Sequence, residues 1–208
     1  TGATIFNQNI SSWNVHNVQN MHEMFKAARA FNKNIGSWNV ERVTAMSSMF
    51  TEAEAFNQNI GNWNVHQVTD MSNMFYEAQA FNQNIGNWNV HKVEDMSGMF
   101  QGANQFNHYI GDWNVHRVED MSSMFQDATN FNQNLAVWDV EQVTDMSSMF
   151  SGATKFNSTI YRQLDEDATF ANIRNFALAQ FNYGFPSSDI EVKEFNGSYN
   201  IYYLNNAK

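Results

Sequence analysis

The sequence predicts an α/β fold, a repeat solenoid in which each coil of 25 residues contributes one short strand and one short helix. Two observations predict it. Phenylalanine recurs every 25 residues from Phe6 to Phe156, which defines six full units over residues 6–155. All six tryptophans and all twelve methionines lie at fixed positions within these units. Because one unit of this size cannot bury its own aromatic and methionine side chains, neighbouring units must stack and share them.

The strand is predicted by alternation in the run WNVHQV. Trp63 and Val65 alternate with Asn64 and His66, which is the two-residue period of a half-buried strand. Equivalent strands of successive coils are expected to form a parallel ladder with a spacing of about 4.8 Å. Tryptophan and valine would then face the core, and asparagine and histidine would face solvent.

The helix is predicted by the residues that follow this strand. The apolar positions are three or four residues apart and would share one helical face. They are Val68, Met71, Met74, Phe75 and Ala78. Thr69 or Asp70 is well placed to cap the helix, because a short side-chain oxygen can accept a hydrogen bond from a free N–H group of the first turn. The segment EAQAFNQNIGN then returns the chain through turns, with Phe81 and Ile85 pointing inward.

Two ladders of repeated side chains allow a second interpretation. The aspartates Asp70, Asp95, Asp120 and Asp145 would stack, and stacked carboxylates can bind calcium. Their position directly before the helix favours capping, and Asn20 fits that role in the first unit whereas Ala45 does not. The methionines could form a thioether array for copper, but their constant position beside the phenylalanines favours core packing.

The repeated residues carry a family resemblance. The run W-N-V-x-x-V-x-D-M-S-x-M-F-x-x-A-x-x-F-N-x-x-I is met six times between residue 1 and about residue 160. It resembles the repeat of the BspA-like bacterial surface proteins, which also occurs in mycoplasma lipoproteins. The resemblance implies a solenoid related to leucine-rich repeats, display on a cell surface, and adhesion or ligand binding in place of catalysis. Ala45, Tyr109, Ala136 and Val137 depart from the pattern, so the sixth unit is expected to present a different surface.

The outward positions of the predicted strand are the candidate ligand-binding residues. One row consists of Asn14, Asn39, Asn64, Asn89 and Asn114, and continues with Asp139. A second row beside it contains His66, His91 and His116, together with His16, Glu41 and Glu141. Such a strip of regularly spaced amide donors and acceptors suits an extended polar ligand, such as a glycan or a peptide segment.

Other roles for these rows remain open. The strand-row asparagines could instead hydrogen-bond to neighbouring backbone, as an internal ladder that stabilises the stack. The asparagines that directly follow the repeated phenylalanine are interpreted as turn builders: Asn7, Asn32, Asn57, Asn82, Asn107, Asn132 and Asn157. Stacked histidines could share a zinc ion or repel one another when protonated, but one histidine per coil supplies too few ligands. We therefore expect a solvated row and no metal.

Composition narrows the classes of function. The net charge of −10, with eleven scattered lysines and arginines, argues against nucleic acid and anionic membranes as partners. No apolar run is long enough to span a bilayer, and there is no cysteine. No nucleophile elbow, metalloprotease motif, phosphate loop or dinucleotide fingerprint is found, so we expect neither an enzyme nor a cofactor. The opening TGATIF repeats the phase of SGATKF, so the chain is expected to be part of a longer array.

The C-terminal residues 161–208 form a second predicted domain after the array of residues 1–160. Asp165 to about Asn182 has the apolar spacing of a helix, at Phe170, Ile173, Ala177 and Phe181. The run DIEVKEFNGSYNIYYL predicts a β-hairpin with its turn at Asn196-Gly197. This helix and hairpin would cap the last coil. The alternative is an aromatic contact surface made by Tyr199, Tyr202 and Tyr203.

The residues and the resemblance together lead to one functional prediction. The chain is expected to be an extracellular, surface-displayed repeat domain that mediates adhesion or ligand binding through the polar strand face. The partner would be a glycan or a protein of a host or neighbouring cell. The alternative is a structural spacer or self-assembling rod, in which coils of separate molecules stack end to end.

Overall fold

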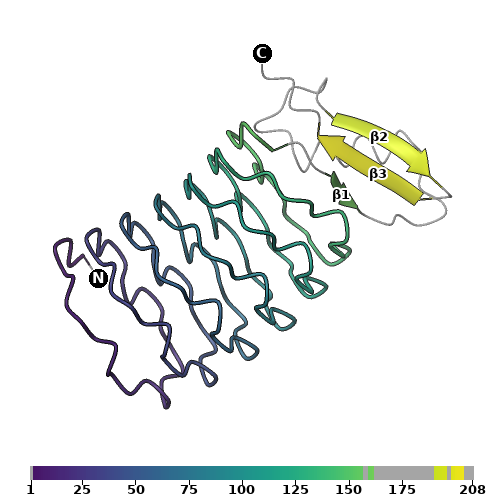
Figure 1. The fold of residues 1–208 in the computed structure, drawn as a ribbon. Helices are drawn as coiled ribbons and strands as arrows, with labels where there is room; N and C mark the ends of the chain where they lie inside the picture. Colours follow the sequence, from purple (N-terminus) through teal and green to yellow (C-terminus); the bar gives the residue numbers. More distant parts are fainter. Residues whose placement is uncertain (1, 157–158, 162–189, 196–197, 204–208) are drawn as a thin grey trace.

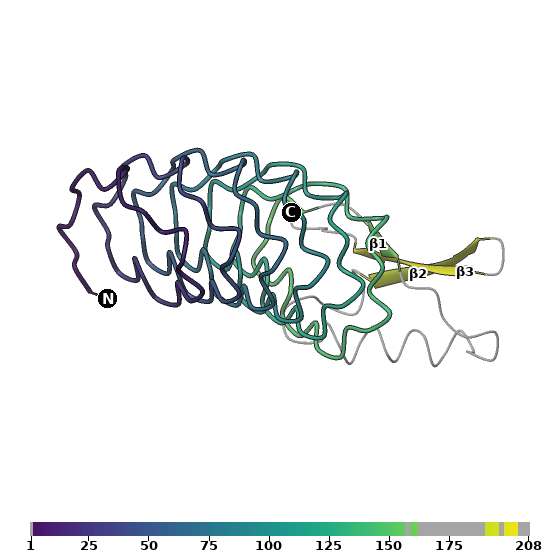
Figure 2. The ribbon, with the colours of Figure 1, turned by 90° about the horizontal axis from the view of Figure 1, so that it is seen from below.

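The computed structural model describes residues 2–156, 159–161, 190–195 and 198–203. Residues 2–156 wind into coils that stack one behind another along a single axis (Figures 1 and 2). Isolated parallel bridges join equivalent residues of successive coils, in the order Asn20, Ala45, Asp70, Asp95, Asp120 and Asp145. The 25-residue spacing of the sequence is therefore the spacing at which residues lie over one another in space.

The predicted α/β solenoid is wrong at the level of the backbone. Residues 2–156 contain no helix and no strand beyond the isolated bridges, and each coil is a succession of turns. A strand and a helix in every coil, as in a leucine-rich repeat, are therefore absent from this part of the chain.

Left-handed residues explain why no helix forms between Met71 and Ala78. Asn73 and Glu77 have φ values of 54° and 52°, which interrupts an α-helix. The N–H of Met74 donates to the carbonyl of Met71 (3.2 Å), whereas the N–H of Asn73 donates to the carbonyl of Ser97 in the next coil (2.8 Å). Since an α-helix would bind all these N–H groups inside its own coil, the turns exchange helical bonds for bonds between coils.

The predicted strand fails for a related reason. Trp63 and Val65 are buried and Asn64 is exposed, so the predicted alternation of sides is confirmed. The backbone bends in turns and does not extend as a strand. In one of these turns the N–H of Val68 donates to the carbonyl of Val65 (2.9 Å).

The core consists of the side chains that were predicted to face inward. Met71, Met74 and Phe75 have no exposed surface, and the phenylalanines stack both within a coil and between coils. The rings of Phe75 and Phe81 are 3.9 Å apart, and those of Phe75 and Phe100 are 5.6 Å apart. The burial of the methionines supports their interpretation as packing residues.

Buried tryptophans join neighbouring coils through their indole nitrogen. Nε1 of Trp88 donates to the carbonyl of Ile60 in the preceding coil at 3.1 Å. The same bond recurs from Trp38, Trp63, Trp113 and Trp138 at 3.1–3.2 Å. Each of these isoleucine carbonyls also accepts the backbone N–H of the tryptophan three residues later, as Ile60 does from Trp63 at 3.0 Å, so the indole supplies its second hydrogen bond.

Three strands form a separate antiparallel sheet in the order β1-β3-β2. They are β1 (Thr159–Tyr161), β2 (Ile190–Phe195) and β3 (Ser198–Tyr203). The pairing of β2 with β3 confirms the predicted hairpin, and β1 was not predicted. The predicted helix from Asp165 to Asn182 and the side chains of the tyrosine surface lie outside the described residues.

Candidate functional site

The candidate ligand-binding residues lie on one outward side of the coils. The asparagines Asn14, Asn39, Asn64, Asn89 and Asn114 are all exposed. The histidines His66, His91 and His116 beside them are half-buried. We call these two rows, with Asp139 and Glu141 of the last coil, the polar face.

The asparagines of the polar face close turns within their own coil. Oδ1 of Asn89 lies 2.7 Å from Nδ1 of His91 and accepts a hydrogen bond from the N–H of His91 (3.4 Å). Asn114 and His116 repeat both contacts at the same distances. These asparagines therefore bond to neighbouring backbone, as the alternative interpretation expects, but the bonds lie within one coil. A contact between coils occurs at Asn39, whose Nδ2 lies 3.2 Å from Nδ1 of His16 in the preceding coil.

The side-chain nitrogens of three asparagines of this row remain available, whereas Nδ2 of Asn39 contacts His16. Within residues 2–156, no hydrogen bond engages Nδ2 of Asn64, Asn89 or Asn114. Because each of these Oδ1 atoms contacts the histidine two residues later, the Nδ2 group of the same amide is held in one orientation. The polar face therefore displays oriented N–H donors on three successive coils.

A different asparagine row joins the coils. The N–H of Asn57 donates to Oδ1 of Asn32, and the N–H of Asn82 donates to Oδ1 of Asn57, both at 3.0 Å. The bond continues at 2.9–3.1 Å along Asn7, Asn32, Asn57, Asn82, Asn107 and Asn132. The turn-building interpretation of this row is wrong. The sequence signal for its role is that this asparagine repeats without exception, whereas the outward columns contain other residues in some coils.

A third asparagine column, which was not predicted to have a role, also closes turns. Oδ1 of Asn59 accepts the N–H of Gly61, and Oδ1 of Asn84 accepts the N–H of Gly86, both at 3.0 Å. Tyr109 stands in this column in the next coil.

The aspartate row acts locally as well. Oδ1 of Asp70 accepts the N–H of Ser72 at 2.9 Å and its Oγ–H at 2.7 Å. The predicted capping bond is therefore present, although it closes a turn and not a helix. The described residues contain no group of three or more histidine, aspartate or glutamate side chains placed to hold a metal ion, so the stacked aspartates give no support to a calcium site.

The polar face is hollowed at its last two coils. An open hollow of about 520 Å³ is lined by residues that include Glu94, His116, Arg117, Glu119, Asp139 and Glu141. Three of them belong to the polar face. Its four carboxylates outnumber its one guanidinium, so the hollow favours neutral or positively charged groups over anions.

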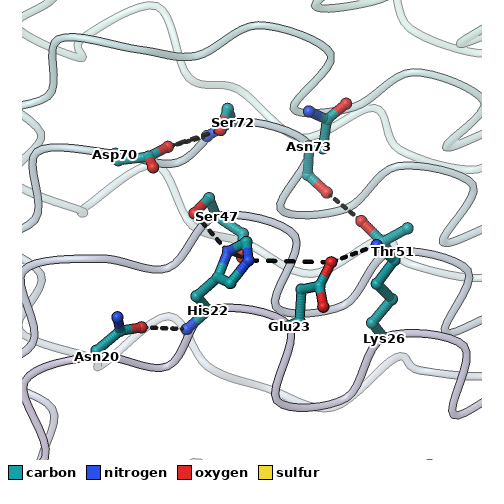
Figure 3. A network of polar contacts seen from close by, with 9 residues as sticks. All are labelled: Asn20, His22, Glu23, Lys26, Ser47, Thr51, Asp70, Ser72 and Asn73. Atoms are coloured by element: carbon teal, nitrogen blue, oxygen red, sulfur yellow. Dashed lines mark hydrogen bonds and ion pairs between the residues drawn. The ribbon is translucent and has the colours of Figure 1, made fainter. Parts of the chain in front are cut away.

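A serine, a histidine and a glutamate meet at the first two coils (Figure 3), which raises the question of a catalytic triad. Nδ1 of His22 lies 2.8 Å from Oγ of Ser47 and 3.0 Å from the Ser47 carbonyl. A carbonyl can only accept, so Nδ1 carries the proton and cannot act as the base for Ser47. Nε2 is 3.9 Å from Oε1 of Glu23, and Ser47 is buried. This geometry suits a hydrogen-bonded link between two coils and does not activate Ser47 as a nucleophile.

Coils that repeat one sequence pattern and share one continuous core define this chain as a repeat protein. The family described as "Mycoplasma protein of unknown function, DUF285" matches residues 1–88 and 80–182, and the chain belongs to this family. No curated protein matches the chain, and no solved structure does. Among the described residues, no helix is long and apolar enough to cross a membrane.

Proposed function

We propose that this chain is a surface-displayed binding module that recognises an extended polar ligand through the polar face. The observation that supports the proposal is the set of fixed amides of Asn64, Asn89 and Asn114, whose oxygens contact histidines of their own coil and whose nitrogens stay free within residues 2–156. The ligand would be a glycan or a segment of a protein on a host or neighbouring cell. The resemblance of the repeat to BspA-like surface proteins supports display outside the cell.

Preorganisation is the physical basis of this proposal. A side chain that is already fixed loses little conformational entropy when it binds, so more of its hydrogen-bond energy appears as affinity. The buried rings and the bonds between coils hold the turns that carry the amides. Donors repeated on successive coils would engage a ligand at several points, which increases the total affinity.

Replacing Asn64, Asn89 and Asn114 together by aspartate is the sharpest test. Aspartate keeps the oxygen that closes the turn, as Oδ1 of Asp139 does with the N–H of Glu141 (3.2 Å), but it removes the N–H donor. We expect the triple variant to keep its thermal stability and to lose binding to immobilised oligosaccharides and to intact cells by more than about tenfold.

The matched control is the triple variant Asn34→Asp, Asn59→Asp and Asn84→Asp. These exposed asparagines also close turns through Oδ1, at 2.9–3.0 Å, but lie in the third asparagine column. The control adds the same negative charge and should bind as the unchanged chain does. Equal binding by both triple variants, or no binding by the unchanged chain to any glycan or cell, would overturn the proposal in favour of a structural rod.

A further inference from the structure

One tyrosine interrupts the otherwise polar edge of the coils. Tyr109 is 46 % exposed and occupies the place at which Asn59 and Asn84 close turns in other coils. Its hydroxyl donates to Oδ1 of Asp112 at 2.9 Å. A Cβ atom at Gly111 would lie 2.6 Å from Cε2 of the tyrosine ring, so the ring lies directly over the glycine backbone. The hydrogen bond and the glycine together fix the ring against the coil, with part of its surface open to solvent.

The polar face connects this ring to the hollow. Asp112, Asn114 and His116 are outward residues of one coil and alternate with buried Trp113 and Val115. The five residues from Asp112 to His116 are joined by four residue steps and span at most about 14 Å. The tyrosine ring and the hollow therefore lie at the two ends of one short polar strip.

We infer that this strip is a subsite for a neutral oligosaccharide, an inference that rests on the proposed function and names its ligand class. The negative face of the tyrosine ring suits the C–H groups on the flat side of a sugar. Nδ2 of Asn114 donates to a sugar oxygen, and the second oxygen of Asp112 accepts from a hydroxyl. In the hollow, the guanidinium of Arg117 donates to further sugar oxygens and carboxylates accept from hydroxyls.

Charge and backbone geometry favour this class over others. The carboxylates of Glu94, Glu119 and Asp139 repel sialylated or sulfated sugars. One common way for an extended peptide to bind is to add a strand to a free sheet edge, and residues 2–156 contain no strand to which it could add. The groups on offer are side chains that point outward, which match a ligand covered with hydroxyls.

The test uses variants that follow the repeat pattern of the chain. Tyr109→Asn restores the residue found in other coils and removes the ring, and Tyr109→Phe keeps the ring but removes the bond to Asp112. The control Tyr76→Gln removes a half-buried tyrosine at the position where Gln101 and Gln126 stand. The probes are arrays of neutral, sialylated and sulfated oligosaccharides, and calorimetry records the thermal stability of each variant.

We expect the unchanged chain to prefer neutral oligosaccharides. Tyr109→Asn should weaken this binding by more than about tenfold, Tyr109→Phe by a smaller factor, and Tyr76→Gln should have no effect. Neutral-glycan binding that survives Tyr109→Asn, or a preference for sialylated or sulfated glycans, would overturn the inference. Binding to cells that is lost in the Asn64, Asn89 and Asn114 variant but unaffected by Tyr109→Asn would also overturn it, while leaving the proposed function intact.

Discussion

Substituting Trp88 by phenylalanine measures how strongly the indole bonds hold the coils together. Trp88 is 3 % exposed, and its Nε1 donates to the carbonyl of Ile60 at 3.1 Å. Phenylalanine removes this bond, but the carbonyl keeps the N–H of Trp63 as a donor at 3.0 Å, so the loss costs about 0.5–1.5 kcal/mol. The smaller ring also leaves a gap between Trp63 and Trp113, whose rings are each 6.5 Å from Trp88, at a cost of about 1–2 kcal/mol. The unfolding free energy should fall by about 2 kcal/mol.

The same substitution at Trp13 is the matched control, because it lies at the same position of the repeat. Trp13 is 54 % exposed, and its indole makes no hydrogen bond within the described residues. Its replacement should cost less than about 1 kcal/mol. Differential scanning calorimetry should show Tm falling by about 4–8 °C for Trp88→Phe and far less for Trp13→Phe. Equal shifts in the two variants would refute the reasoning, since the change in side chain is identical.

Two further predictions follow from close contacts on the surface and between coils. A Cβ at Gly61 would lie 2.3 Å from the carbonyl oxygen of Asn84, so Gly61→Ala should push two coils apart and cost about 1–3 kcal/mol. Thermal unfolding should show little loss for Ala136→Gly, at the same position in the last coil, and a harmless Gly61→Ala would contradict the close packing. The hydrogen bond from Lys26 lowers the pKa of the Glu23 carboxyl, so its stabilising effect is present above the unfolded pKa and is lost as pH falls through the lower, folded pKa. An NMR titration should show the Glu23 pKa rising in Lys26→Met, and an unchanged value would argue against this contact.

Whether a residue faces the core or solvent could be predicted from the sequence, but the path of the backbone could not. Met71, Met74 and Phe75 are buried as their spacing predicts. Hydrophobic spacing reports which side chains face inward, and consecutive turns can produce the same spacing as a helix. The missed signal was glycine inside the predicted helix, at Gly98 and Gly102, both of which have positive φ. Glycine is the residue that adopts this conformation most readily, so its presence there argued for turns.

The asparagine row from Asn7 to Asn132 was assigned to the wrong role for a similar reason. Asn89 and Asn57 are both polar residues beside buried aromatic ones, and both amides can accept from a backbone N–H. The choice between an N–H two residues away and one in the next coil depends on the local direction of the backbone. That direction follows from the turns, which the spacing of apolar residues did not reveal. The outward exposure of the candidate row, which depends only on sides, was predicted correctly.

The separation of these roles has a consequence for recognition. The asparagines that join the coils are the same in every unit, as the bonds from Asn7 to Asn132 illustrate. The outward residues are free to change, and they do so at one end, where Tyr109, Val137 and Asp139 replace asparagines. A ligand lying along the proposed binding face would meet repeated donors in the middle and different groups at the last coils. Because the two ends of the face differ, such a ligand would bind in one direction only, so its register and orientation would be set by the last two coils.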